Sequence, residues 1–132
     1  MSNRSLVNDV AIVGVGGAGT NIAFCLEKLG YTTIHINSST QDESAIKGAK
    51  NIRHLKGFNG CAGNRALAEK ALAENMDIVD EISALEESIV YVIFSSAGGT
   101  GSGVSTALID MLVEETDKTI CAIVVLPDKD ED

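Results

Sequence analysis

The chain has 132 residues, the size of a single domain, and carries 13 glycines, one proline, three cysteines and no tryptophan. Its hydrophobic fraction of 45% and charged fraction of 22% are typical of a globular domain, which excludes global disorder. The formal net charge of −9 argues against binding of nucleic acid or an anionic membrane through charge alone. An acidic protein can still hold a phosphate, because backbone amides bind anions without a basic side chain.

The cysteines Cys25, Cys61 and Cys121 are far apart and form no C-x-x-C pair. This pattern indicates neither a disulfide framework nor a zinc site, and it favours a reducing, cytoplasmic setting. The first residues do not have the shape of a signal peptide, and no apolar run reaches the roughly 18 residues that span a bilayer. We therefore expect a cytoplasmic protein without a membrane segment.

Strand-like and helix-like stretches alternate along the chain. Short apolar or β-branched runs predict strands at 10–13, 32–37, 51–55, 88–94 and 119–126. Helical spacing of apolar residues, or a helix-favouring composition, predicts helices at 20–29, 64–75, 77–85 and 104–115. This alternation predicts an α/β fold with a parallel sheet flanked by helices, and such sheets bind ligands at the carboxyl ends of their strands.

The first glycine-rich segment, residues 14–21, follows the first strand and leads into the first helix. Unpaired amides at a helix start attract anions, and Gly14, Gly16 and Gly19 match the dinucleotide-binding pattern G-x-G-x-x-G. That pattern also needs an acidic residue at the end of the next strand, where this sequence has Asn37, Ser38 and Ser39. This difference weakens the interpretation of the chain as a nicotinamide dinucleotide-binding domain of an oxidoreductase, but that interpretation stays an alternative. A tight turn that binds no ligand is a further alternative.

A second glycine-rich segment, residues 95–103, also follows a buried strand and precedes a helix. Its closely spaced glycines, with Thr100 and Ser102 between them, offer backbone amides and hydroxyl donors suited to a second part of a polyphosphate. The segment has no lysine in the order G-x-x-x-x-G-K-[ST], so the P-loop is excluded. We therefore predict two phosphate-binding segments on one edge of the sheet.

Residues 97–103, with the sequence AGGTGSG, resemble the signature loop [SAG]-G-G-T-G-[SAT]-G of the tubulin/FtsZ superfamily. Residues 14–21 resemble the G-x-G-G-x-G-x-N opening of that family, and residues 60–64 resemble its loop facing the γ-phosphate. Asn37, Ser38 and Ser39 occupy the place of its N-T-D-like loop, with Ser39 where an acidic residue is often found. The resemblance covers nearly the whole chain, and it is nearer to bacterial, plasmid or phage tubulin-like proteins than to eukaryotic tubulin.

The resemblance implies that the chain binds GTP or GDP, with Mg²⁺ held through phosphate oxygens and water. It also implies a Rossmann-like sheet of the tubulin/FtsZ GTPase-domain type, truncated after the fifth strand. Gly16, Gly17, Ala18 and Gly19 would face the α- and β-phosphates, and Asn21 would lie near the guanine or ribose. The other nucleotide-binding residues implied are Gly60, Ala62, Gly63, Asn64, Ala97, Gly98, Gly99, Thr100, Gly101 and Ser102. No catalytic residue or protein ligand for the metal is assigned.

Members of this family polymerise head to tail and hydrolyse GTP at the subunit junction. Their uses include DNA or phage positioning, plasmid segregation and division. We expect residues 1–132 to be the GTP-binding amino-terminal domain, without the central helix and carboxyl-terminal domain that complete hydrolysis. The expected partners are further copies of the full-length protein and a DNA-binding adaptor, with no direct nucleic-acid or membrane contact. The alternative is a non-hydrolysing nucleotide-binding module that caps tubulin-like filaments.

Overall fold

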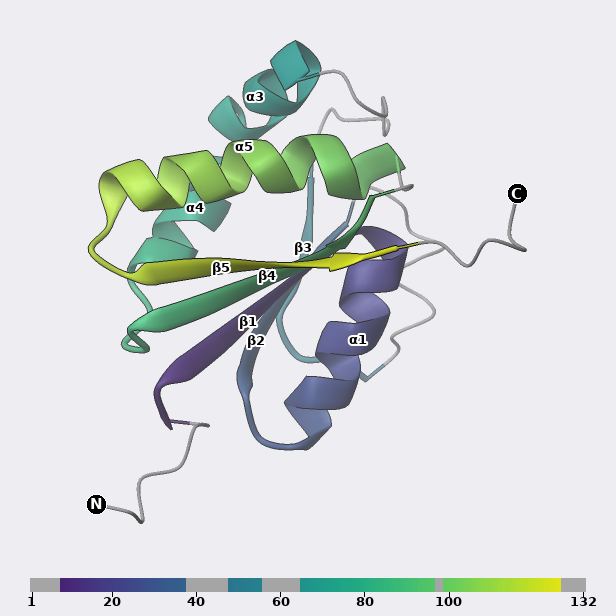
Figure 1. Cartoon of the computed structure of the whole chain (residues 1–132), viewed down its shortest axis with the longest axis vertical. Helices are drawn as coiled ribbons and strands as arrows, with labels where there is room; N and C mark the ends of the chain where they lie inside the picture. The colour runs from purple at the N-terminus through teal and green to yellow at the C-terminus, as the bar shows by residue number, and fades with distance from the viewer. Residues whose placement is uncertain (1–7, 38–47, 56–64, 97–98, 127–132) are drawn as a thin grey trace.

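The computed structural model describes residues 8–37, 48–55, 65–96 and 99–126 (Figure 1). The described strands form one parallel sheet in the order β3-β2-β1-β4-β5. They are β1 (Val10–Val15), β2 (Thr32–Asn37), β3 (Ile52–His54), β4 (Ile89–Ser95) and β5 (Thr119–Val125). The described helices are α1 (Gly16–Lys28), α3 (Arg65–Ala73), α4 (Met76–Ser83) and α5 (Gly99–Glu115). The predicted parallel sheet flanked by helices is confirmed.

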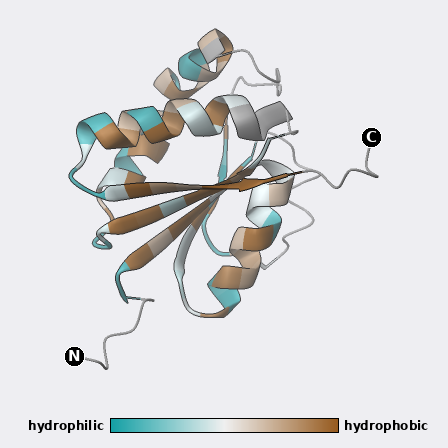
Figure 2. Cartoon of the chain, in the orientation of Figure 1, coloured by the Kyte–Doolittle hydropathy of each residue, from teal (hydrophilic) through white to brown (hydrophobic). Residues whose placement is uncertain are grey.

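The two faces of the sheet are covered by different helices, α1 on one face and α3, α4 and α5 on the other (Figure 1). Side chains of β1 alternate between the two: Ala11, Val13 and Val15 pack in the cluster with α3, α4 and α5, whereas Val10 and Ile12 pack with α1. Burial on both faces explains why β1 is an unbroken apolar run, as Figure 2 shows for the central strands.

The order of the strands places the two predicted phosphate-binding segments side by side. The chain runs outward from β1 through β2 to β3, then returns to pair β4 with the other side of β1 and β5 with β4. The direction of winding therefore reverses between β1 and β4, and parallel α/β sheets bind ligands at such a reversal. Gly14 is paired in register with Ile93, so β1 and β4 finish together.

Both glycine-rich segments are more regular than the sequence predicts. β1 continues to Val15 and α1 begins at Gly16, four residues before the predicted start, while α5 begins at Gly99 rather than at residue 104. A positive φ of 76° at Gly16 allows this direct strand-to-helix turn, because glycine adopts that conformation without steric cost. Most of the glycines that the structure describes therefore lie at the end of β1 or at the starts of α1 and α5.

The other elements lie close to their predicted positions. β2 has the predicted bounds, β3 is shorter than expected, and β4 is shifted by one residue. Helices α3 and α4 each end two residues before the predicted end. The predicted loop at 56–63 lies outside the described residues. No described helix is both long and apolar enough to cross a membrane.

Strand β5 forms one edge of the sheet and is only partly covered. Ile123 and Val124 are 40% and 44% exposed, whereas the corresponding residues of the neighbouring strand, Ile93 and Phe94, are buried. An apolar run in the sequence does not distinguish a central strand such as β4 from an edge strand such as β5. It shows that the side chains can be buried, but not whether another element covers them.

Candidate functional site

The first turn of α1 presents backbone amides to the carboxyl edge of the sheet. Val15 is extended, with φ −125° and ψ 127°, and its side chain does not cap the helix. The first amides of a helix have no acceptor within the helix, and here no acidic side chain lies in the first turn to neutralise their partial positive charge. Gly17 and Ala18 in this turn are only partly buried. These features give the turn the properties of an anion-binding site.

Close packing fixes this turn against the sheet. A β-carbon on Gly19 would lie 2.1 Å from the carbonyl oxygen of Ile93, and one on Gly14 would lie 2.6 Å from the carbonyl oxygen of Gly19. Real β-carbons do not approach other atoms so closely, so both positions require glycine. Gly14 and Gly19 therefore serve the packing of α1 on β1 and β4, whatever contacts the amide of Gly19 also makes.

Two buried side chains join the first turn of α1 to the end of β2. The Asn37 amide nitrogen donates to the Thr20 hydroxyl at 3.3 Å, and that hydroxyl donates to the carbonyl oxygen of Gly17 at 3.2 Å. Thr20 and Asn37 are both fully buried. Neither side chain is among the residues predicted to bind the nucleotide, although Asn37 ends a β-branched strand where such sheets place their ligands.

The start of α5 lies next to that of α1, after the neighbouring strand. The amide of Ser96, just beyond β4, donates to the carbonyl oxygen of Val125 at 3.1 Å, which fixes the chain at the end of β5. Helix α5 then begins at Gly99 and has no acidic residue in its first turn. Because α1 and α5 follow adjacent parallel strands on opposite faces, their positive ends converge on one edge (Figure 1).

The predicted site residues fall into two groups. Gly16, Gly17, Ala18, Gly19 and Asn21 lie in the first two turns of α1, with Asn21 exposed, and Gly99, Thr100, Gly101 and Ser102 lie at the start of α5. Gly60, Ala62, Gly63, Asn64, Ala97 and Gly98 lie outside the described residues. The fold thus brings the described members of both segments to the same edge.

A second polar network lies near the other end of α1. His35 in β2 is fully buried, and its Nε2 lies 2.7 Å from a carboxylate oxygen of Glu27. Glu27 also accepts hydrogen bonds from the Thr33 hydroxyl at 2.8 Å and from the Lys50 amide at 3.2 Å. Burial acts to raise the pKa of Glu27, but the hydrogen bonds with His35, Thr33 and Lys50 outweigh it and lower the pKa below its ordinary value. This network ties α1 to β2 and to the chain before β3.

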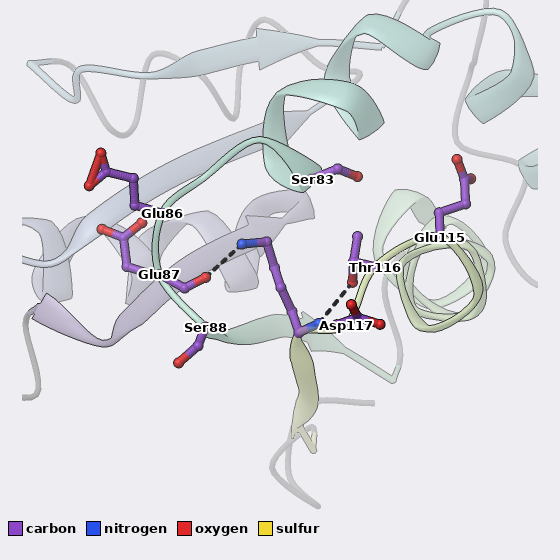
Figure 3. Close-up of a pocket in the computed structure, with 8 residues that line it drawn as sticks. Ser83, Glu86, Glu87, Ser88, Glu115, Thr116 and Asp117 are labelled. Carbon is purple, nitrogen blue, oxygen red and sulfur yellow. Dashed lines mark hydrogen bonds between the residues drawn. The ribbon is translucent and has the colours of Figure 1, made fainter.

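A pocket of about 370 Å³ lies at the opposite edge of the sheet, where chain turns lead into β4 and β5 (Figure 3). Its lining includes the carboxylates Glu86, Glu87, Glu115 and Asp117. The Lys118 ammonium donates to the backbone oxygens of Leu85 and Glu87, so it is already hydrogen-bonded within the protein. The pocket is therefore unsuited to phosphate. Within the described ranges, no group of three or more His, Cys, Asp or Glu residues is arranged to hold a metal ion.

Comparisons with known proteins agree with this geometry. CetZ, a tubulin-like protein of Thermococcus kodakarensis, is 31% identical over 132 aligned residues, which cover 91% of this chain and 35% of that protein. The solved structure of TubZ from Clostridium botulinum phage c-st, with its C-terminal tail truncated, superposes with a TM-score of 0.81 at 27% identity. That match covers 97% of this chain and 44% of the TubZ chain.

A third similarity concerns the fold alone. CetZ2 from Haloferax volcanii, solved as a GTPγS-bound protofilament, superposes with a TM-score of 0.74 at 21% identity and covers 94% of this chain and 41% of that chain. The chain spans about a third of the length of the CetZ relatives it matches, 35% to 36%. The family model described as "Tubulin/FtsZ family, GTPase domain" matches residues 9–132. This match shows that the chain belongs to the tubulin/FtsZ family, and the parallel sheet with two glycine-rich helix starts at one edge agrees with it.

Proposed function

We propose that this chain binds GTP or GDP at the edge where β1 and β4 end, as the amino-terminal part of a filament-forming GTPase. The observation that carries this proposal is the convergence of two helix starts, α1 and α5, on adjacent strands where the winding of the sheet reverses. Neither helix has an acidic residue in its first turn. Two such helix ends can stabilise a chain of phosphates, and membership of the family specifies a guanine nucleotide.

The phosphates would accept hydrogen bonds from the amides of the two helix starts. In α1 the donors would be Gly16, Gly17, Ala18 and Gly19, and Asn21 would contact the ribose or base. In α5 the backbone amides of Gly99–Ser102 and the hydroxyls of Thr100 and Ser102 would contact the β- and γ-phosphates. Gly60, Ala62, Gly63, Asn64, Ala97 and Gly98 complete the proposed nucleotide site on the strength of the sequence motifs.

Mg²⁺ would be held chiefly by phosphate oxygens and water. This ion keeps much of its hydration shell and commonly binds together with the phosphates of a nucleotide. At this edge the structure shows the backbone amides at the starts of α1 and α5, which suit the phosphates that would carry the ion. When bound, the ion would neutralise phosphate charge, and the protein residues would orient the phosphates around it.

The full-length protein is proposed to assemble head to tail and to hydrolyse GTP at the junction between subunits. The support is the GTPγS-bound protofilament of H. volcanii CetZ2, a protein that shares this fold. The proposed partner is therefore another copy of the full-length protein, together with a DNA-binding adaptor for a segregation role. The oxidoreductase alternative has no support from the family match, and β2 ends in Asn37 rather than an acidic residue.

Titration of GTP, GDP, ATP and NADH against the chain tests the proposal, with calorimetry and thermal unfolding as readouts. We expect GTP and GDP to bind and to raise the melting temperature. Preferential binding of NADH would contradict the proposal. The double variant Gly99→Ala/Thr100→Ala should lose nucleotide protection with an unchanged circular dichroism spectrum. Cys25→Ala, an exposed change on α1, is the matched control and should bind like the wild type.

A further inference from the structure

The hydrogen bonds between β2 and the first turn of α1 act on a peptide group that faces the proposed nucleotide site. A threonine hydroxyl in a helix often bonds back to a carbonyl one turn earlier, as Thr20 does to Gly17. What is particular here is that a side chain of another element, Asn37, donates to the same hydroxyl. With both side chains fully buried, the position of the hydroxyl is set by the sheet as well as by the helix.

The carbonyl of Gly17 and the amide of Ala18 belong to one planar, trans peptide group. When the Thr20 hydroxyl holds the carbonyl oxygen, the N–H of Ala18 is directed the opposite way, towards the open end of the helix. This restraint matters because three of the first four residues of α1 are glycines, which have more conformational freedom than other residues. A site built from amides binds an anion best when the amides are already oriented.

The Asn37 side chain ends β2 and donates its one described side-chain hydrogen bond, from Nδ2 to the Thr20 hydroxyl. Leucine at this position would fill a similar volume and could not make this bond. The contribution of Asn37 that the described residues show is therefore the restraint on the Thr20 hydroxyl.

We propose that Thr20 and Asn37 are positioning residues, which orient the Gly17–Ala18 peptide group for a phosphate of the bound nucleotide. This inference rests on the proposed function, since it assigns a task to residues behind the same site. Neither side chain needs to touch the ligand. Their effect on binding passes through the backbone of the first turn of α1.

The test compares Thr20→Val, which removes the hydroxyl at nearly constant shape, with Thr20→Ser, which keeps it. We expect Thr20→Val and Asn37→Leu to weaken GTP binding about tenfold by calorimetry, and Thr20→Ser to stay within about threefold of the wild type. Ser105→Ala is the control, because it removes a buried hydroxyl that has no partner within the described part of the chain. It should leave GTP affinity unchanged.

Backbone ¹⁵N order parameters of the ligand-free chain provide a readout that general destabilisation would not reproduce. In Thr20→Val, Gly17 and Ala18 should become more mobile, while Phe24 in the same helix keeps a value of about 0.85. Wild-type GTP affinity and wild-type order parameters in both Thr20→Val and Asn37→Leu would overturn the positioning role. Failure of the unmodified chain to bind GTP would instead contradict the proposed function, and the order parameters would still decide whether the two side chains hold the turn.

Discussion

Gly19 in α1 lies directly against Ile93 in β4, so closely that a β-carbon on Gly19 would come within 2.1 Å of the Ile93 carbonyl oxygen. A backbone oxygen in the middle of a sheet cannot move aside as the end of a flexible side chain can. The contact therefore determines how near the first turn of α1 lies to β4. It couples the packing of the helix to the position of the amides proposed to bind phosphate.

Gly19→Ala should be destabilising and should also displace the first turn of α1. The added methyl group must push the helix away from β4, and overpacking of this kind typically costs about 1–3 kcal/mol. Because the atom in the way is a backbone oxygen at 2.1 Å, we expect this cost to outweigh the benefit of about 1 kcal/mol that alanine normally brings to a helix interior. We expect a lower free energy of unfolding in urea denaturation, together with weaker GTP binding.

Cys25→Ala is the matched control for Gly19→Ala, because it changes an exposed position of the same helix. It should alter the free energy of unfolding by no more than about 0.5 kcal/mol. If Gly19→Ala were as stable as Cys25→Ala and bound GTP normally, the close approach of α1 to β4 would be wrong.

Much of the fold follows from patterns that are local in the sequence. The bounds of β2 are predicted correctly because its β-branched residues are followed at once by polar ones. The predicted starts of α1 and α5 are wrong because glycine has a low helix propensity. Propensity alone therefore does not predict a glycine-rich helix turn that tertiary packing stabilises. At Gly19 the propensity is overridden by the close approach to Ile93, and that contact is non-local.

The candidate site shows the same division. The phosphate-binding role proposed for Gly16–Gly19 comes from the spacing of the glycines. Such spacing is visible in a sequence because glycine is needed where φ is positive or where the backbone packs closely. The bond between Thr20 and Asn37 joins residues 17 positions apart and could not be predicted, because a lone threonine or asparagine is compatible with many roles. The ion pair of Arg53 with Glu81 could not be predicted either, because its two residues are also far apart in the sequence.

The network around Glu27 predicts a pH dependence of stability. Because the pKa of Glu27 is lower in the folded chain than its ordinary value of 4.5, the ionised carboxylate favours folding above that value. The contribution is lost as the pH falls through the lowered, folded-state pKa. Glu27→Gln should therefore be less stable than the wild type at pH 7, by about 1.5–3 kcal/mol, and the difference should shrink towards pH 3.

Urea denaturation at a series of pH values measures this difference directly. Glu114→Gln, an exposed change on α5, serves as the control and should follow the wild-type profile at every pH. A gap between Glu27→Gln and the wild type that stays constant from pH 7 to pH 3 would show that ionisation of Glu27 contributes nothing to folding.

The ion pair between Arg53 in β3 and Glu81 in α4 should contribute little to stability. Its two hydrogen bonds are short, at 2.7 and 2.6 Å, but the side chains are 33% and 36% exposed. The hydrogen bond to Glu81 raises the pKa of Arg53, yet solvent screens a pair exposed to this extent. A double-mutant cycle with Arg53→Met and Glu81→Gln should give a coupling energy below about 1 kcal/mol, decreasing with added salt. A coupling energy above about 2 kcal/mol that is insensitive to salt would contradict this view.

Lys118 should matter for stability and not for nucleotide binding. Its ammonium donates to the backbone oxygens of Leu85 and Glu87, the latter at 2.6 Å, and so ties the chain before β5 to the chain before β4. Lys118→Met keeps most of the apolar stem and leaves both oxygens without this donor, which should cost about 1–3 kcal/mol.

Lys70→Met, an exposed change on α3, is the control and should be nearly neutral in the same urea denaturation experiment. GTP affinity should be unchanged in both variants, because Lys118 lies at the edge of the sheet opposite the proposed nucleotide site. A loss of GTP affinity in Lys118→Met at full stability would show instead that the two edges are coupled.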